Sequence, residues 1–230
     1  MAWIETEMLL RHVVPLGGTA TCALLAAMLI VSAGSAGWAE PESTIVDEWA
    51  GVPVPPPPEL SDVTVSAART ALLILDVQNQ NCSAETRPRC VASLPRITTL
   101  LEQCRNRGLP VVYTLTRNAT VEDIREEVAP LPGEPAVASG VDKFYATELE
   151  EILRERGVEA VVLVGTSAHG AVLGTATGAA LRGLEVIVPV DGMSASEPYA
   201  EQYTAWHLAN SPGTRGRTTL TTVARITVEP

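Results

Sequence analysis

The residue best placed to transfer a proton is Asp76, which directly follows the apolar run "ALLIL". A carboxyl group at the end of a buried strand loses contact with water. This desolvation raises its pKa and suits it to general acid or base catalysis. The alternative is a structural role, in which Asp76 caps the turn that follows. Asp191, in "PVDGMSA", is interpreted as a turn residue of that kind.

A second candidate is Lys143, in the stretch "VDKFYATEL", because it is the only lysine in a chain that has fifteen arginines. Arginine supplies every other cationic side chain, so the retained amine indicates a task that needs a compact charge whose pKa moves on burial. Chance is the alternative. Arg117 and Arg125 are candidates for binding a carboxylate, with a solvated surface position as the default for each.

The third candidate is the turn "GTSAHGA", residues 165–171, which joins an apolar run to a helical pattern. His169 lies at the start of that helix, where it is placed to orient a substrate. His207, beside Trp206, is interpreted as a packing residue. No histidine or cysteine has a partner at metal-ligand spacing, so we expect neither a metal nor another cofactor.

The elements that position these residues alternate between strands and helices. Six strands are predicted, at "TALLILD", "PVVYTL", residues 136–137, "EAVVLVG", "LEVIVPVD" and "RTTLTTVARITV". Helices are predicted over residues 91–107, 147–156, 168–182 and 197–210. Continuous apolar strands separated by helices predict a doubly wound α/β sandwich of three layers with a mainly parallel sheet. Its ligand crevice lies beyond the carboxyl ends of the strands. Three places there qualify: Asp76 with Gln78 after the first strand, residues 165–171 after the fourth, and Asp191 after the fifth.

Composition limits the partners. The formal net charge is −11, and we find no cluster of Lys and Arg, so nucleic acid is not expected as a partner. A small-molecule substrate is expected instead. Apolar residues make up 46% of the chain, which is sufficient for a sizeable aliphatic core.

The first 39 residues contain an uncharged stretch of small and apolar residues that ends in "GWA", typical of a signal peptide. An uncleaved membrane anchor is the alternative, and it would be the chain's only membrane contact. Residues 40–66 are rich in proline and are interpreted as an extended arm or linker. The predicted domain covers residues 67–230. We therefore expect a periplasmic or secreted protein.

Removal of a signal peptide would leave three cysteines, Cys82, Cys90 and Cys104. In an oxidising compartment a Cys82–Cys90 bridge is one interpretation. Free thiols packed in the core are the other.

Three segments, "LLILDVQNQNC", "DKFYATELEEIL" and "VVLVGTSAHGAVLGTATGAALRGLEVIVPVDGMSA", together resemble the isochorismatase-like or cysteine hydrolase superfamily. The resemblance spans residues 70–190 and implies a six-stranded parallel sheet. It also implies an aspartate after the first strand, a lysine after the third and a cysteine at the helix after the fourth. Members are commonly dimers or larger, so a homo-oligomer is expected.

The resemblance places Asp76 at the aspartate and Ala171 at the cysteine. Alanine cannot form a thioester, so cysteine-amidase chemistry at this position is excluded. The superfamily also contains isochorismatases, which do without the thiol. In that branch the aspartate is a general acid on a vinyl ether, and Gln78 matches a residue that holds substrate.

The same resemblance implies a non-proline cis peptide between Thr166 and Ser167. The backbone amides of Gly170 and Ala171 would then form a donor pair for an oxyanion or carboxylate. The family lysine falls at Ala138 in an ungapped alignment, so Lys143 matches it only if the loop is shortened.

Two functional hypotheses follow. The first is an exported hydrolase of a small metabolite that uses Asp76 as general acid or base, with Lys143 as its cationic neighbour and no cysteine nucleophile. The second is a non-catalytic protein that binds a small ligand on a hydrolase fold. A nucleophilic Cys82 is a third, weaker hypothesis.

Overall fold

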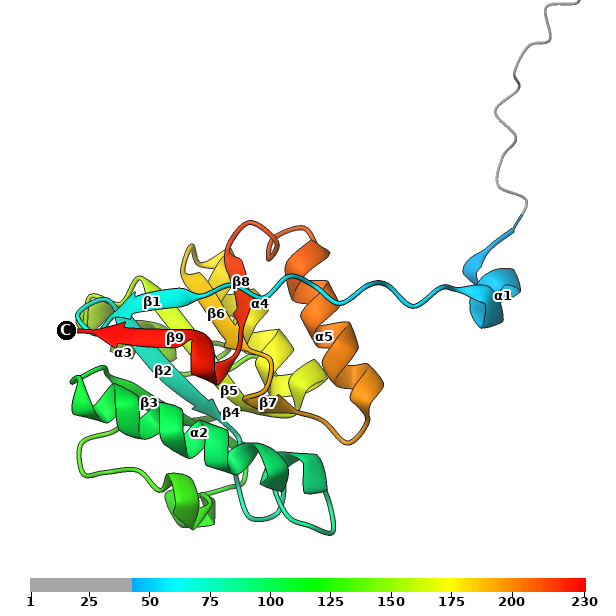
Figure 1. Ribbon diagram of the computed structural model, residues 1–230. Helices are drawn as coiled ribbons and strands as arrows, with labels where there is room; N and C mark the ends of the chain where they lie inside the picture. Colours follow the sequence, from blue (N-terminus) through cyan, green and yellow to red (C-terminus); the bar gives the residue numbers. More distant parts are fainter. Residues whose placement is uncertain (1–42) are drawn as a thin grey trace, which may run out of the picture. The chain divides into compact units, whose positions relative to one another are not determined.

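The computed structural model describes residues 43–230, divided into one unit that ends at Val52 and a second that covers Pro53–Pro230 (Figure 1). The predicted signal peptide or anchor, residues 1–39, lies outside the described residues. In the first unit, helix α1 (Ile45–Glu48) begins at Thr44, whose side chain caps it, and the 3₁₀ turn η1 (Trp49–Gly51) follows. No helix in the described part of the chain is long and apolar enough to cross a membrane.

The centre of the second unit is a parallel sheet in the order β4-β3-β2-β5-β6-β8. Its strands are β2 (Thr70–Leu75), β3 (Val111–Thr116), β4 (Ala136–Ser139), β5 (Ala160–Thr166), β6 (Glu185–Pro189) and β8 (Thr218–Thr221). A short seventh strand, β7 (Met193–Ser194), pairs with the end of β5. The chain moves outward in one direction from β2 and in the other from β5. The carboxyl ends of these two neighbours therefore form the switch point where ligands bind in such folds.

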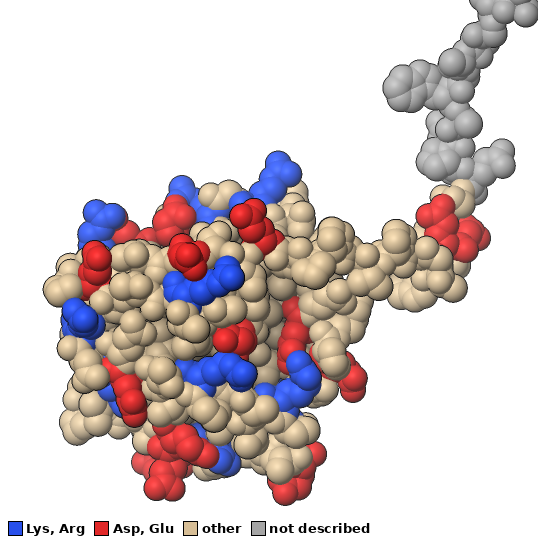
Figure 2. Space-filling view, viewed as in Figure 1, with Lys and Arg blue, Asp and Glu red and all other residues tan. Residues whose placement is uncertain are grey.

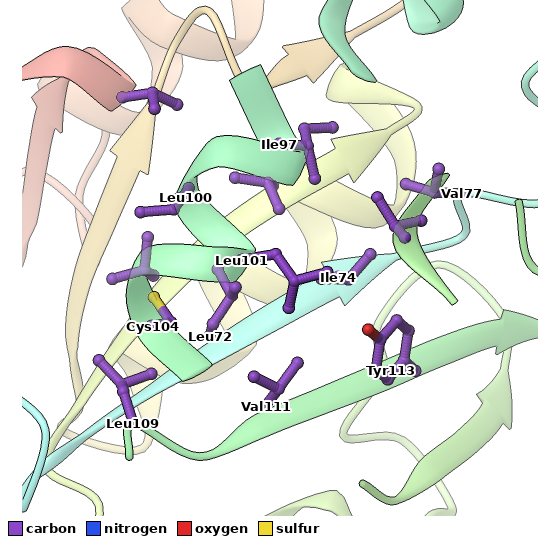
Figure 3. Packing of buried hydrophobic residues seen from close by; sticks show 14 of the residues in the cluster. Leu72, Ile74, Val77, Ile97, Leu100, Leu101, Cys104, Leu109, Val111 and Tyr113 are labelled. Atoms are coloured by element: carbon purple, nitrogen blue, oxygen red, sulfur yellow. The ribbon is translucent and has the colours of Figure 1, made fainter. Parts of the chain in front are cut away.

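Two apolar layers cover the sheet. Alternate residues of β2 point to opposite faces, so Leu72 and Ile74 pack beneath α2 (Pro88–Asn106) (Figure 3), while Leu73 and Leu75 pack on the other side. That second side is covered by α3 (Leu149–Glu155), α4 (Leu173–Leu181) and α5 (Pro198–Asn210). The three-layer α/β sandwich predicted from the continuous apolar strands is confirmed.

The structure differs from the sequence prediction at the end of the chain. The expected last strand is two strands, β8 and β9 (Ile226–Glu229), separated by the 3₁₀ turn η5 (Val223–Arg225). Strand β9 pairs in parallel with β1 (Val63–Ser66), the end of the segment interpreted as an arm. Their side chains join the core under α2. Because this pairing joins the two ends of the domain, no local pattern in the sequence could predict it.

Cys82 and Cys90 form a disulfide, with their Cα atoms 5.2 Å apart. Of the two interpretations left open by the sequence, the bridge is the one found. Cys104, on α2, is a buried free thiol whose pKa is raised to about 12 by burial. The bridge joins the loop after β2 to the first turn of α2.

Charged side chains are mixed on the face of the domain seen in Figure 2, where basic and acidic residues alternate. Surface ion pairs such as Arg69 with Glu159 and Arg217 with Glu185 contribute to this pattern. Exposed pairs of this kind each contribute about 1 kcal/mol or less to stability.

Candidate functional site

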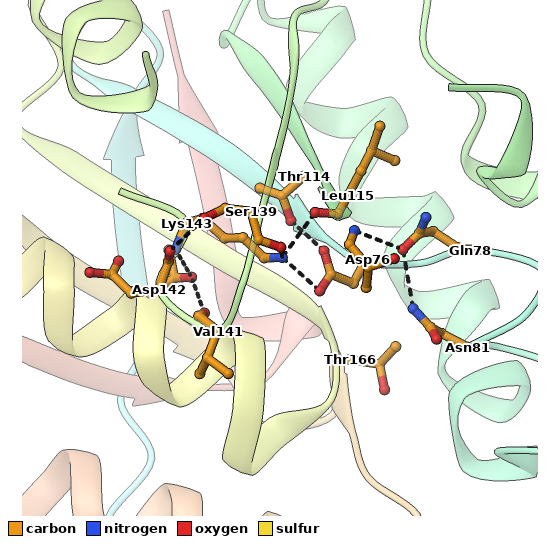
Figure 4. Close-up of polar contacts among 12 residues, drawn as sticks. Asp76, Gln78, Asn81, Thr114, Leu115, Ser139, Val141, Asp142, Lys143 and Thr166 are labelled. Carbon is orange, nitrogen blue, oxygen red and sulfur yellow. Dashed lines mark hydrogen bonds and ion pairs between the residues drawn. The ribbon is translucent and has the colours of Figure 1, made fainter. Parts of the chain in front are cut away.

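The centre of the site is an ion pair between Asp76 and Lys143 (Figure 4). The Nζ atom of Lys143 lies 2.8 Å from Oδ2 of Asp76, and it also donates to the backbone oxygens of Leu115 (3.1 Å) and Ser139 (3.4 Å). The hydroxyl of Thr114 donates to Oδ1 of Asp76 at 2.9 Å. Lys143 is completely buried and Asp76 is 6% exposed. Every donor position of the ammonium group is thus occupied within the protein.

Burial raises the pKa of Asp76 above its usual value, and this effect outweighs the opposing effects of Lys143 and Thr114. The pair therefore holds an aspartate that binds a proton more readily than an exposed one. This is the property required of a general acid. The sequence predicted a raised pKa for Asp76 because this residue follows a buried strand. Burial is also the main cause of the raised pKa in the structure.

Lys143 reaches Asp76 from the loop between β4 and α3. The loop packs directly on α4, where two glycines leave room for it. A Cβ atom on Gly174 would lie 2.7 Å from Val141, and one on Gly178 would lie 2.7 Å from Asp142. The small-residue face of α4 therefore allows the loop to bring the amine beneath the end of β2.

The junction between β5 and α4 forms the second wall of the site. Gly165 has a φ of +127°, and a Cβ atom there would lie 2.1 Å from the backbone oxygen of Leu75, the residue before Asp76. Only glycine allows this close approach of the two strands. The Thr166–Ser167 peptide is cis, as the resemblance implied.

The helix after β5 begins with a π-helical turn, Ala168–Val172, instead of the continuous α-helix predicted. The backbone N–H of Gly170 donates to the oxygen of Ser167 at 3.0 Å. It is therefore already used within the turn. This corrects the prediction that the amides of Gly170 and Ala171 form a donor pair, because one member of the pair has a partner.

A pocket of about 370 Å³ opens between these two walls. It lies at the carboxyl ends of β2, β3, β4 and β5, and its lining includes Asp76, Asn81, Arg87, Thr116, Arg117, Val141, Thr166, Ser167, Gly170 and Ala171. This volume is at the lower end of the range for small-molecule sites. None of its lining residues is a cysteine, and the methyl group of Ala171 occupies the position where the resemblance places the nucleophile.

Two residues predicted to bind substrate do not line this pocket. Gln78 is buried, and its Oε1 accepts hydrogen bonds from the backbone of Thr116 (3.2 Å) and from Asn81 (3.1 Å). Its side chain thus braces the loop that carries Asn81. His169 is exposed and also lies outside the lining. The resemblance gave the residue types at these positions but not the direction in which each side chain points.

The other polar candidates have structural partners. Asp191 accepts a hydrogen bond from the backbone of Val223 at 2.8 Å, in agreement with its interpretation as a turn residue. His207 contacts Tyr203 on α5. Cys82 is buried in the disulfide, so it is not a free nucleophile in this structure.

The pocket residues that sequence reasoning missed include Arg87 and Asn81, and Arg117 was identified only as a candidate. The first two lie in a polar loop with no periodic pattern, and such residues are ordinarily solvated. Their position beside Asp76 depends on the path of the loop, which the sequence does not reveal.

Comparison with solved structures identifies the class of fold. An isochorismatase-like hydrolase from Alkaliphilus metalliredigens superposes with a TM-score of 0.62, at 23% identity over 68% of this chain and 96% of the other. An N-carbamoylsarcosine amidase from Thermoplasma acidophilum gives 0.58, also at 23% identity, over 67% and 96%. At this identity the likeness establishes the fold.

Residues 70–223 match the isochorismatase domain, so the chain belongs to the isochorismatase family. The Secreted isochorismatase effector Isc1 of Verticillium dahliae is 32% identical over 142 residues, which cover 56% of this chain and 75% of the effector. Enterobactin synthase component B of Escherichia coli is 24% identical over 150 residues, 55% of this chain and 53% of that protein. The chain thus spans about half the length of the second relative.

Proposed function

We propose that the protein is an exported hydrolase that cleaves a small enol ether, with Asp76 as general acid and without a covalent intermediate. One observation carries this proposal: a buried aspartate with a raised pKa, paired with Lys143, lines a pocket in which Ala171 stands at the family's nucleophile position. A methyl group forms no thioester, so the proton donor is the group left to start the reaction.

In the proposed reaction the protonated carboxyl group of Asp76 donates its proton to the terminal carbon of the substrate's carbon–carbon double bond. Water then adds to the ether carbon, and the resulting hemiketal separates into an alcohol and a keto acid. Lys143 stabilises the carboxylate that remains after proton transfer, because its ammonium group lies 2.8 Å away in a buried site. The carboxylate regains its proton when the water that adds is deprotonated.

Export is supported by two observations. The relative from Verticillium dahliae is named as a secreted effector. The Cys82–Cys90 disulfide is of a kind that persists in oxidising compartments and is rare in the cytosol. We propose that the mature protein is periplasmic or secreted and forms a homo-oligomer. N-terminal sequencing and size-exclusion chromatography of protein from the producing cells test the two parts of this proposal separately.

The catalytic proposal is tested by release of pyruvate from isochorismate and simpler carboxyvinyl ethers, measured with coupled lactate dehydrogenase. We expect Asp76→Asn to lower kcat by about 10²- to 10⁴-fold, the usual contribution of a general acid. Asp62→Asn is the matched control, since that side chain is 90% exposed. The wild-type rate should fall as the pH rises through the raised pKa of Asp76, because the acid form is lost. Turnover that Asp76→Asn leaves intact would refute the assignment.

A second candidate function is binding of a small ligand without turnover. The absence of a cysteine from the pocket lining favours it, because the reaction most dependent on that residue is lost. A thermal shift with isochorismate, in the absence of any pyruvate release across the substrate panel, would support this candidate over the hydrolase.

A further inference from the structure

The loop between β2 and α2 is closed into a ring by the disulfide. Cys82 and Cys90 are both fully buried, and within the ring the backbone N–H of Arg87 donates to the oxygen of Ser83 at 2.9 Å. At its start, the N–H of Cys82 donates to the oxygen of Gln78 at 2.7 Å. The ring is therefore fixed at both ends, and Arg87, the N-cap residue of α2, is held within it.

The guanidinium group of Arg87 reaches from this ring across the pocket to β5. Its Nη1 donates to Oγ1 of Thr166 at 2.7 Å, and its Nε lies 3.5 Å from Oγ of Ser196. Arg87 is half-buried and lines the pocket, yet within residues 43–230 it makes no ion pair with a carboxylate. Arg89, two residues later, is paired with Glu201. A half-buried guanidinium with hydroxyl partners alone keeps its full charge available to a ligand.

Arg117 brings a second guanidinium group to the same pocket. It follows β3, and its side chain lies 3.4 Å from the place where a Cβ atom of Gly140 would stand. It too has no ion pair among the described residues. The charge of Asp76, the one carboxylate in the lining, is balanced by Lys143. The pocket therefore carries an excess of positive charge in a chain whose net charge is −11.

We propose that Arg87, held over the pocket by the Cys82–Cys90 disulfide, binds a carboxylate group of the substrate together with Arg117. The disulfide is then a positioning element of the substrate site as well as a structural bridge. Arginine suits this task because its planar fork donates two parallel hydrogen bonds to one carboxylate. The inference rests on the proposed function only in taking this pocket as the substrate site.

Binding of a stable dicarboxylate tests the first part without any turnover. Isothermal titration calorimetry compares isophthalate, which has two carboxylates, with its uncharged analogue isophthalamide. We expect wild type to bind isophthalate in preference to isophthalamide, and Arg87→Gln to weaken isophthalate binding by about tenfold or more. Arg107→Gln is the matched control, because Arg107 is exposed at the other end of the same helix and should bind like wild type. Equal affinity of Arg87→Gln and wild type, or no preference for the dianion, would overturn the proposal.

The role of the disulfide is tested with the double variant Cys82→Ala/Cys90→Ala. Freeing Arg87 adds an ordering cost to binding, so isophthalate affinity should fall by about 2- to 10-fold. In the Arg87→Gln background the same double change should have no further effect, since the group being positioned is absent. Cys104→Ala, which removes a buried thiol of similar size, should leave the affinity unchanged.

A purely structural bridge would instead lower the affinity equally in both backgrounds, and that result would contradict the positioning role. If the double cysteine variant does not fold, Thr166→Val replaces it. This change removes the acceptor that holds Nη1 of Arg87 and should reproduce the loss of affinity. An unchanged affinity in Thr166→Val would count against the proposal. These measurements do not depend on catalysis, so a protein that hydrolyses enol ethers but ignores isophthalate refutes this inference alone.

Discussion

Replacement of Lys143 by methionine removes the ammonium group at the centre of the site while keeping a long side chain in its buried position. At the observed 2.8 Å, with an effective dielectric constant of about 20, the attraction between Lys143 and Asp76 is about 6 kcal/mol. The cost of removing both groups from water offsets part of this attraction. Loss of one partner from a buried pair typically lowers stability by about 3–5 kcal/mol. We expect a loss of that size for Lys143→Met at pH 8.

The loss should become smaller as the pH falls. Without Lys143, burial alone acts on the carboxyl group, and the pKa of Asp76 rises further above its ordinary value of 3.8. A carboxyl group with a raised pKa binds its proton more tightly in the folded state. Its contribution to stability is complete below the unfolded pKa and is lost as the pH rises through the folded pKa. The variant should therefore be closer to wild type at pH 5 than at pH 8.

Urea unfolding followed by circular dichroism at the two pH values measures both effects. With a slope of about 2 kcal/mol per molar urea, the midpoint should fall by about 2 M at pH 8. The double variant Asp76→Asn/Lys143→Met should recover much of the loss, because no buried charge then lacks a partner. A loss below about 1 kcal/mol, or one of equal size at pH 5 and pH 8, would show that the pair is not the buried ion pair described above.

Two further substitutions test the walls of the pocket. Gly165→Ala should lower the free energy of unfolding by about 3 kcal/mol or more, because its Cβ atom would overlap the backbone oxygen of Leu75. Gly157 also has a positive φ but lies in open space, so Gly157→Ala should lower the free energy of unfolding by only about 1–2 kcal/mol. If urea unfolding shows equal losses of stability for the two variants, the close approach of β2 and β5 is disproved. Ala171→Cys should place a thiol in the pocket that iodoacetamide alkylates. The buried Cys104, with its pKa raised to about 12, should resist the reagent, and peptide mass spectrometry showing no modification at residue 171 would refute the placement of this residue.

Much of the fold could be predicted from the sequence because its determinants are local. A continuous run such as "ALLIL" is apolar on both faces, so it predicts a strand covered on both sides whatever its neighbours are. Gly108, Gly157 and Gly183 mark helix ends correctly, since each has the positive φ that ends a helix. The pairing of β1 with β9 was missed because it depends on two short strands 163 residues apart in register, Val63 and Ile226.

The residues of the site likewise fall into those that could be predicted from the sequence and those that could not. Asp76 and the junction at Gly165 were found because each is bound to the end of a recognisable strand, and Lys143 was found because its residue type occurs once. The orientation of Gln78 was not predictable, because the direction of a side chain in a loop depends on its hydrogen-bond partners. In the structure it braces a loop and does not line the pocket.

By itself, then, the sequence determined the order of strands and helices, the family and the carboxylate at the end of β2, since these depend on patterns within short segments. The tertiary structure alone decided that Lys143 reaches Asp76 and that Arg87 lines the same pocket. Lys143 is 67 positions from Asp76 along the chain. Arg87 is 79 positions from Thr166, the residue to which its guanidinium group donates. The Asp76–Lys143 contact depends on the packing of the Lys143 loop against the glycines of α4. Packing of that kind is a property of the assembled sheet and helices.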